Sequence, residues 1–224
     1  ITSSGHDVVF WFGEKSVSGE FSGSYLRYQA LYALTVIGNQ TVSVVVSGEA
    51  AGSATVDVAA GALDLTSCVL CVTPSRPVAG EVTSATLQLR DQYGNVLDGA
   101  ARVAASLFTF GQNLVSGSYQ ASGNVVAGNW SFETTGTFSV SASLSGATAG
   151  SAASVEVVPA ALSPETSELS VDQTSLFAGD LLTARALLRD GFGNSLTNAS
   201  RVAMSFDFNS TEVTGELLTE TVSH

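Results

Sequence analysis

The chain has 224 residues, of which 45% are hydrophobic and only 12% charged; this balance excludes intrinsic disorder, because disordered chains combine low hydrophobicity with high charge. Its formal net charge of −12 disfavours nucleic acids and anionic lipid headgroups as partners. No run of apolar residues approaches the roughly 20 that span a bilayer, so we expect no direct membrane insertion.

Similar segments return along the chain at a nearly constant spacing. The segment "FWFG" at 10–13 returns as "FTFG" at 108–111, and "LRDQYGN" at 89–95 returns as "LRDGFGN" at 188–194. The first pair is 98 positions apart and the second 99, which is too long for a solenoid unit and fits one small β domain. We therefore predict the C-terminal part of a repeat at 1–63, a complete repeat at 64–162 and the N-terminal part of a third at 163–224.

The two outer parts are incomplete in this interpretation. Ile1 enters in the middle of a repeat, and His224 comes before the strands that would close the last one. Because a partial sandwich lacks strands, we expect residues 1–63 to obtain them from a longer polypeptide or from a partner chain.

In the complete repeat, apolar and polar residues alternate as in β-strands, and no segment keeps the 3.6-residue period of an amphipathic helix. Turn residues separate the alternating stretches at 74–77, 91–95, 122–124 and 134–136. The alternating residues are, in chain order, Leu70 and Val72; Ala85, Leu87 and Leu89; Val103, Ala105 and Leu107; Trp130 and Phe132; Phe138, Val140 and Ala142; and Val155 and Val157. About seven short strands in such a length are typical of an Ig-like β-sandwich, so we predict an all-β fold.

These segments also resemble a known type of domain. "LQLRDQYGNVLDG" resembles the D-x-x-G-N-x-V strand and turn of filamin-type repeats and of the Ig-like domains of bacterial invasin-type adhesins. An aromatic residue at Tyr32 or Trp130, followed by "TVSVVVSG" or "FSVSASLSG", resembles the last two strands of a filamin repeat. The resemblance implies tandem Ig-like domains that act as spacers, adhesive modules or scaffold arms.

Four Asn-x-Ser/Thr sequons indicate candidate sites of N-glycosylation, whereas roughly two would arise by chance. Asn39 follows a turn glycine, and Asn129 should point outward because its neighbour Trp130 points inward. The sequons begin at Asn39, Asn129, Asn198 and Asn209. We expect at least one to carry an N-linked glycan, which would place the chain outside the cell; the alternative is that all four are bare polar turn residues.

Cys68 and Cys71 form a "CVLC" motif on a predicted strand. A zinc site would need about four ligands, and the other candidates, His6 and His224, are distant in sequence. Alternation places Cys68 on the inner face with Leu70 and Cys71 on the outer face. A disulfide between the two needs a local turn, so the choice stays open between that bridge and a bond to a cysteine elsewhere or in a neighbouring subunit.

Aromatic residues near the N-terminus could suggest a carbohydrate platform. Phe10 and Phe12 alternate inward, however, and Tyr32 occupies the position that Trp130 takes 98 residues later. We interpret these as core residues and expect only Trp11 to face outward, under a glycan or at a contact between subunits. The remaining aromatic candidates are Tyr25 and Tyr28.

Catalytic and metal-binding signals are weak. There is no Gly-x-Ser-x-Gly elbow, no His-Glu-x-x-His motif, no phosphate-binding loop and no His in the complete repeat. Asp91 and Asp190 begin "DQYGN" and "DGFGN"; calcium would need several converging oxygen ligands, whereas aspartates in such turns usually bind their own backbone. We predict no enzyme activity, no cofactor and no metal.

The preferred hypothesis is a structural extracellular glycoprotein whose tandem Ig-like domains build a fibre, stalk or cell-surface appendage. The alternatives are the spacer of an adhesion-receptor ectodomain and an intracellular filamin-like scaffold that accepts peptides by β-augmentation. The expected partners are neighbouring Ig-like domains, either of the same chain or of other subunits in self-assembly.

Overall fold

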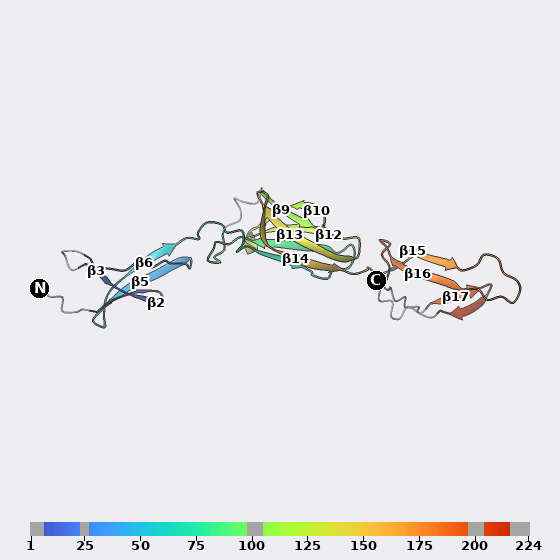
Figure 1. Ribbon diagram of the computed structural model, residues 1–224, viewed down its shortest axis with the longest axis horizontal. Coiled ribbons are helices and arrows are strands. Elements are labelled where there is room, and N and C mark those ends of the chain that lie inside the picture. The colour runs from blue at the N-terminus through green and yellow to red at the C-terminus, as the bar shows by residue number, and fades with distance from the viewer. Residues whose placement is uncertain (1–6, 23–26, 98–104, 197–203, 216–224) are drawn as a thin grey trace. The chain divides into compact units, whose positions relative to one another are not determined.

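The structure is a computed structural model that describes residues 7–22, 27–97, 105–196 and 204–215. The regular structure of these residues is β-strand, apart from the 3-10 turn η2 (Ala121–Gly123) (Figure 1). The predicted all-β fold is confirmed. The strands are β1 (Val8–Phe12), β2 (Lys15–Ser18), β3 (Glu20–Ser22), β4 (Arg27–Gln29), β5 (Gly38–Val46), β6 (Glu49–Val58), β7 (Val69–Thr73), β8 (Val82–Gln88), β9 (Ser106–Phe110), β10 (Asn113–Ser116), β11 (Ser118–Gln120), β12 (Val125–Ser131), β13 (Gly136–Leu144), β14 (Ala147–Val157), β15 (Leu162–Val171), β16 (Ala184–Asp190), β17 (Ser205–Phe208) and β18 (Thr211–Thr214). Among the residues that the structure describes, no helix has the length and apolar character that a membrane crossing requires.

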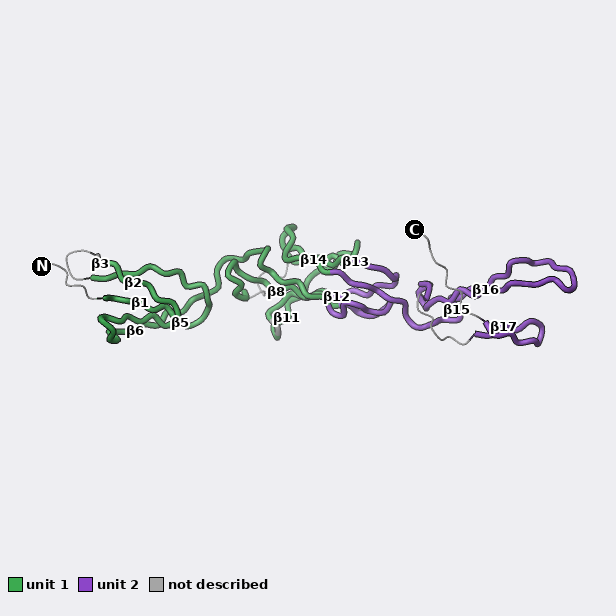
Figure 2. The backbone as a smooth tube through the Cα atoms, turned by 60° about the horizontal axis from the view of Figure 1, so that its bottom comes forward, with its two compact units in different colours: residues 1–72, 84–128, 139–153 green, residues 73–83, 129–138, 154–224 purple. Residues whose placement is uncertain are grey.

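The chain forms two compact units, which Figure 2 distinguishes by colour. Unit 1 comprises residues 1–72, 84–128 and 139–153, and unit 2 comprises residues 73–83, 129–138 and 154–224. Both units thus include strands of the predicted complete repeat. The three-part division at residues 63 and 162 remains a prediction.

Eight strands, β7 to β14, form two four-stranded sheets. One sheet has the order β10-β9-β13-β14, and the other has the order β11-β12-β8-β7. On β8 and just after it, Ala85, Leu87 and Leu89 are fully buried, as the alternation predicted. Half-buried or exposed residues lie between them, so each strand presents one apolar face to the core.

The two sheets face one another closely at Gly128. A Cβ atom on this β12 residue would lie only 2.6 Å from Cδ2 of Phe108, which belongs to β9 in the other sheet. Glycine therefore lets the phenylalanine ring pack directly against the opposite backbone. This is the two-layer packing of an Ig-like sandwich, and the predicted Ig-like fold class is confirmed.

The alternation predicted at 103–107 is wrong. Ala105 and Leu107 are exposed, Leu107 to 39%, whereas Ser106, Phe108 and Phe110 are buried. A strand can bury only every second residue, and the two rings bury more apolar area than alanine and leucine would. Val103, the third residue of that prediction, lies outside the described residues.

The sheets repeat along the chain as the segments do. In β1 and β5, Phe10 pairs with Val44; in β9 and β13, Phe108 pairs with Ala142, and each of these is 98 positions further on. The pair β3–β4 likewise has the register of β11–β12. The pair β17–β18 has the register of β9–β10, so that β17 matches β9 and β18 matches β10. Segments that match in sequence therefore occupy matching places in their sheets.

Candidate functional site: two matching Asp-Asn turns

The repeated motif Asp-x-x-Gly-Asn forms two tight turns, here named the first Asp-Asn turn (Asp91–Asn95) and the second Asp-Asn turn (Asp190–Asn194). In the first, the Asp91 amide donates to the Asn95 carbonyl at 3.0 Å, and the Gly94 amide donates to the Asp91 carbonyl at 3.0 Å. Gly94 has a φ of +85°, a conformation that favours glycine. The second turn has both bonds at 2.9 Å, and its glycine has a φ of +84°.

Each aspartate holds its own turn together. Oδ1 of Asp91 accepts hydrogen bonds from the amides of Tyr93 at 2.9 Å and Asn95 at 3.0 Å. Oδ1 of Asp190 accepts the equivalent bonds from the amides of Phe192 at 3.0 Å and Asn194 at 2.8 Å. The prediction that these aspartates bind their own backbone is confirmed for both turns.

The same aspartates also hold a segment that lies 30 positions earlier. Oδ2 of Asp91 accepts the Gly61 amide at 2.8 Å, and Oδ2 of Asp190 accepts the Ala160 amide at 2.9 Å. Both carboxylates are buried, with exposures of 1% and 0%. Gly61 follows β6, and Ala160 lies between β14 and β15. Each turn therefore fixes the stretch that links one set of strands to the next.

Hydrogen bonding keeps both carboxylates ionised. For Asp91, the bond from the Asn95 side chain is the largest influence; together with the backbone amides it lowers the pKa to about 2, although burial acts in the opposite direction. For Asp190, burial is the largest influence and raises the pKa, but the bonds from Asn194, Ala160 and Phe192 outweigh it and leave the pKa below its usual value. Both side chains are therefore acceptors for N–H donors at neutral pH.

The asparagine of each turn reaches a loop about 60 positions earlier. Nδ2 of Asn95 donates to the Thr35 carbonyl at 2.9 Å. Nδ2 of Asn194 donates to the Glu133 carbonyl at 2.7 Å, and Oδ1 of Asn194 accepts the Thr135 amide at 3.0 Å. Thr35 lies just before β5 and Glu133 just before β13, the strand that matches β5. The two turns thus make the same long-range contact within their own units.

The second turn adds an aromatic contact. A Cβ atom on Gly80 would lie 2.5 Å from Cζ of Phe192, so the phenylalanine ring lies directly over the glycine backbone. Gly80 precedes β8 and has a φ of +84°. In the first turn, Tyr93 takes the place of Phe192; the two residues are similarly exposed, at 54% and 48%.

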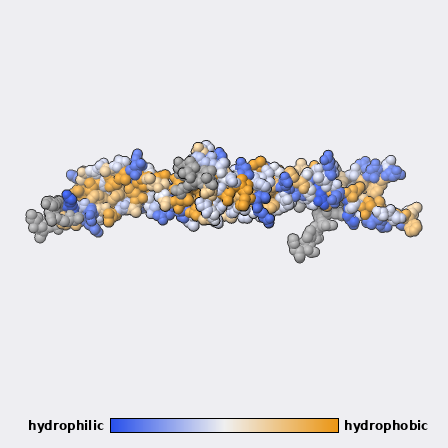
Figure 3. All heavy atoms as spheres, turned by 90° about the horizontal axis from the view of Figure 1, so that it is seen from above, coloured by the Kyte–Doolittle hydropathy of each residue, from blue (hydrophilic) through white to orange (hydrophobic). Residues whose placement is uncertain are grey.

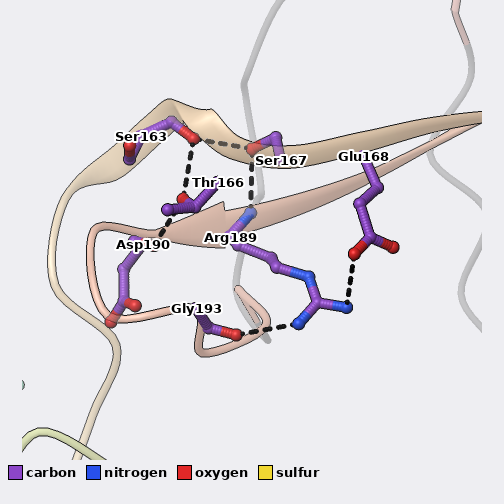
Figure 4. Close-up of polar contacts among 7 residues, drawn as sticks. All are labelled: Ser163, Thr166, Ser167, Glu168, Arg189, Asp190 and Gly193. Carbon is purple, nitrogen blue, oxygen red and sulfur yellow. Dashed lines mark hydrogen bonds and ion pairs between the residues drawn. The ribbon is translucent and has the colours of Figure 1, made fainter.

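Polar contacts hold the strands beside the second turn (Figure 4). Arg189 donates to the Gly193 carbonyl at 3.1 Å and forms an ion pair of 3.3 Å with Glu168. Thr166 Oγ1 donates to the Asp190 carbonyl at 2.6 Å, and the Arg189 amide donates to Ser167 Oγ at 3.0 Å. These bonds cross the irregularity in β15, where the register with β16 shifts between Ser163 and Glu168.

The hydrogen bonds of each turn join it to two backbone segments that lie earlier in the chain. The carboxylate oxygen atoms of both aspartates are occupied by N–H donors. Within the described ranges, no group of three or more His, Cys, Asp or Glu residues lies close enough to hold a metal ion. What the two turns can do is hold consecutive sets of strands to each other.

The sequons lie on the surface where the structure describes them. Asn39 is exposed at the start of β5, and Asn129 is exposed on β12, as predicted from its half-buried neighbour Trp130. Asn209 is exposed in the turn between β17 and β18, with a φ of +53°. Asn198 lies outside the described residues. Glycosylation of these residues stays a prediction.

Cys71 lies on β7, whereas Cys68 directly precedes this strand and, contrary to the prediction, is not part of it. Cys68 is buried and Cys71 is exposed, and the sulfur of Cys68 lies 3.4 Å from the Asp64 carbonyl. Their pairing stays a prediction. His6 and His224, the histidines considered beside them, lie outside the described residues.

The N-terminal aromatic residues are only partly covered. Trp11 is 39% exposed, so its predicted outward position is confirmed. Phe10 and Phe12 are half-buried, and Tyr32 stacks on Phe12 at a ring distance of 5.0 Å, although it remains 41% exposed. Tyr28 is half-buried on β4, and Tyr25 lies outside the described residues.

No protein-family model and no curated protein matches the sequence. Solved structures do match. Invasin, described as a bacterial integrin-binding protein, is similar with a TM-score of 0.50 and 16% identity over 93% of this chain and 46% of its own. The Escherichia coli adhesin FdeC matches with a TM-score of 0.49 and 23% identity over 73% of this chain and 54% of its own. InvD of Yersinia pseudotuberculosis matches with a TM-score of 0.47 and 22% identity over 86% and 62%.

The likeness to invasin shows the fold, which is that of tandem Ig-like domains. The chain spans about half the length of the invasin and FdeC chains that it matches.

Proposed function

We propose that the chain is a non-catalytic spacer of a cell-surface or extracellular protein, in which tandem Ig-like domains form a stalk. The observation that carries the proposal is that one set of long-range hydrogen bonds occurs twice. The first and second Asp-Asn turns make the same contacts to a linking segment and to an earlier loop, 99 positions apart. A device that recurs between successive modules is what a stalk needs, because it limits bending at each junction.

Several observations support this proposal. The fold is that of invasin, a bacterial integrin-binding protein, and the carboxylate oxygen atoms of both turns are occupied by N–H donors. The division at 1–63, 64–162 and 163–224 belongs to the same proposal, since each turn begins 28 residues after one of the two boundaries (91 − 63 and 190 − 162). The exposed sequons Asn39, Asn129 and Asn209 are proposed as attachment sites for N-linked glycans if the parent protein passes through a glycosylating pathway.

Protease treatment of intact cells that express the native protein tests its location. An antibody against residues 64–162 should lose its signal when an extracellular protease is added, while a cytosolic marker stays intact. A signal that disappears only after lysis would contradict the proposal and favour an intracellular scaffold. Electron microscopy of the shed material then separates a regular polymer, expected of a fibre, from isolated rods, expected of a receptor spacer.

A further inference from the structure

A short backbone segment after β7 lies beside the end of β14 in a parallel arrangement. This segment, residues 75–79, is named the edge segment here. The Glu156 amide donates to the Ser75 carbonyl at 3.0 Å. The Val158 amide donates to the Pro77 carbonyl, also at 3.0 Å, and the pairing is parallel. The edge segment and the stretch from Glu156 to Val158 are together named the parallel pair.

The edge segment is held to the fold by burial as well as by hydrogen bonds. Pro77 is fully buried and Ala79 is 4% exposed, whereas Val78 between them is 44% exposed. The Ala79 amide donates to the Val158 carbonyl at 2.8 Å. The edge segment therefore packs like a strand of the sandwich, and moving it would expose apolar area to water.

Tension along the chain acts on opposite ends of the parallel pair. The chain enters the edge segment from Pro74 and leaves the end of β14 through Pro159. Because the two members run in the same direction, a pull on these two prolines slides one member along the other and loads their hydrogen bonds together. An antiparallel pair pulled from one end would instead open one bond at a time. The parallel pair must therefore break before the residues between the two prolines can extend.

The second Asp-Asn turn contacts the chain directly after both members of the pair. The Phe192 ring lies over Gly80, the residue that follows the edge segment. Oδ2 of Asp190 accepts the amide of Ala160, two positions after Val158, at 2.9 Å. Because the pair is parallel, Gly80 and Ala160 follow its members at the same end, and sliding would move these two residues apart. The turn contacts both of them and therefore opposes sliding.

We propose that the second Asp-Asn turn reinforces the parallel pair against tension, so that the mechanical resistance of the sandwich depends on the strands that follow it. The inference rests on the proposed stalk function, because tension passes along a stalk. Both turn contacts act at one end of the pair, where its members would otherwise separate under load. Unfolding under force is governed by the rate of such a separation rather than by equilibrium stability. The turn therefore slows rupture under tension.

Phe192 is the residue of the turn that can be changed with the least damage to the fold. It is 48% exposed, and exposed hydrophobic residues are seen among hydrophilic ones on the face shown in Figure 3. What distinguishes Phe192 is its contact with the Gly80 backbone. Asp190, by contrast, is fully buried and accepts the backbone amides of its own turn. Phe192→Ala therefore removes one of the two reinforcing contacts and leaves the hydrogen bonds of the turn in place.

Single-molecule force spectroscopy of the 224-residue chain tests the proposal. Thr73 and Ala161, both exposed, are replaced by p-azidophenylalanine to attach the two handles, so that force passes only through the stretch between them. Rupture extends 88 residues (161 − 73) by about 300 Å, which identifies the event. At constant force, Phe192→Ala should rupture at least about fivefold faster than the parent chain with the same handles. Phe192→Tyr should rupture like the parent chain, because it keeps the ring.

Tyr93→Ala is the matched control, since Tyr93 takes the place of Phe192 in the first turn and is 54% exposed. It removes a ring of similar exposure that does not lie over Gly80, so it should rupture at the rate of the parent chain. Acceleration equal to that of Phe192→Ala would overturn the proposal.

A second pulling geometry separates resistance to tension from general stability. With handles at Thr73 and at Ala147, the first residue of β14, force acts on the same ends of the two members and does not slide them. Phe192→Ala should then rupture like the parent chain. Unchanged rupture of Phe192→Ala in the first geometry, or equal acceleration in both, overturns the proposal. Neither result affects the proposed surface location, because that is tested by protease accessibility.

Discussion

The side-chain amide of Asn194 donates a hydrogen bond of 2.7 Å to the carbonyl oxygen of Glu133, which lies 61 positions earlier in the chain. Asn95 makes the matching bond to Thr35 at 2.9 Å. Each of these hydrogen bonds lies at a single junction between sets of strands. Removing one of them should therefore loosen that junction and leave the sandwich core folded. This separates the function of the turns from the stability of the fold.

Asn194→Ala should expose the Thr135 amide to exchange with solvent. That amide donates to Oδ1 of Asn194, and loss of one such bond, worth about 0.5–1.5 kcal/mol, corresponds to about two- to tenfold faster exchange. Hydrogen-exchange mass spectrometry of the peptide around Thr135 measures the effect. Asn95→Ala is the matched control and should leave this peptide unchanged; equal acceleration in both variants would refute the assignment of the contact.

Acid should weaken the first turn in a defined range of pH. The folded-state pKa of Asp91 is lowered from 3.8 to about 2, so the ionised carboxylate stabilises the fold above about pH 4 and loses this contribution as the pH falls towards 2. Melting temperatures measured between pH 5 and pH 2 should fall less steeply in Asp91→Asn than in the parent chain. Asp57→Asn, at an exposed position on β6, controls for the loss of one negative charge. Parallel curves for Asp91→Asn and the parent chain would show that the turn does not depend on the carboxylate.

The corrected register of β9 predicts opposite results for neighbouring residues. Phe108→Ala should lower the free energy of unfolding by about 3–5 kcal/mol, because the ring is fully buried. Leu107→Ala should change it by no more than about 0.5 kcal/mol, because Leu107 is 39% exposed on the other face. Urea denaturation followed by tryptophan fluorescence measures both. A larger loss for Leu107→Ala would reverse the register.

Gly80→Ala should cost more than Gly146→Ala, although both glycines have a φ of +84°. The shared conformational strain is about 1–2 kcal/mol, but only at Gly80 would the new Cβ meet an aromatic ring, that of Phe192, at 2.5 Å. Nothing lies within 4 Å at Gly146. The difference between the two melting temperatures should disappear when Phe192→Ala is added to each. A difference that survives in that background would place the strain elsewhere.

The fold could be predicted from the sequence because its signals are local. Repeated segments gave matching strands, and Ala85, Leu87 and Leu89 alternate clearly enough to define their buried face. The prediction for residues 103–107 failed because Ala105 and Leu107 are apolar but exposed, while the small polar Ser106 at the start of β9 is buried on the core side. There, the choice of face depends on pairing with β13, which lies about 30 residues away.

The candidate site could be predicted only in part. The motif Asp-x-x-Gly-Asn indicates a turn that binds its own backbone, and Asp91 and Asp190 do so. The role of Asn95 and Asn194 could not be inferred, because their partners are backbone groups about 60 positions away. Every residue has a backbone carbonyl, so the sequence does not indicate which one accepts the hydrogen bond. The one available signal was the return of asparagine at the same place in both turns.

Nuclear magnetic relaxation of the ¹⁵N-labelled chain tests the central claim most directly. The measurement uses the 224-residue chain at a concentration at which sedimentation gives the mass of a monomer. Strand β5 and strand β13 should report the same rotational correlation time in that chain, because the first Asp-Asn turn couples them. Replacing Asn95 and Asp91 together by alanine should shorten the correlation time of β5 while β13 keeps its own. Equal correlation times before and after the double substitution would contradict the claim that these turns join successive modules.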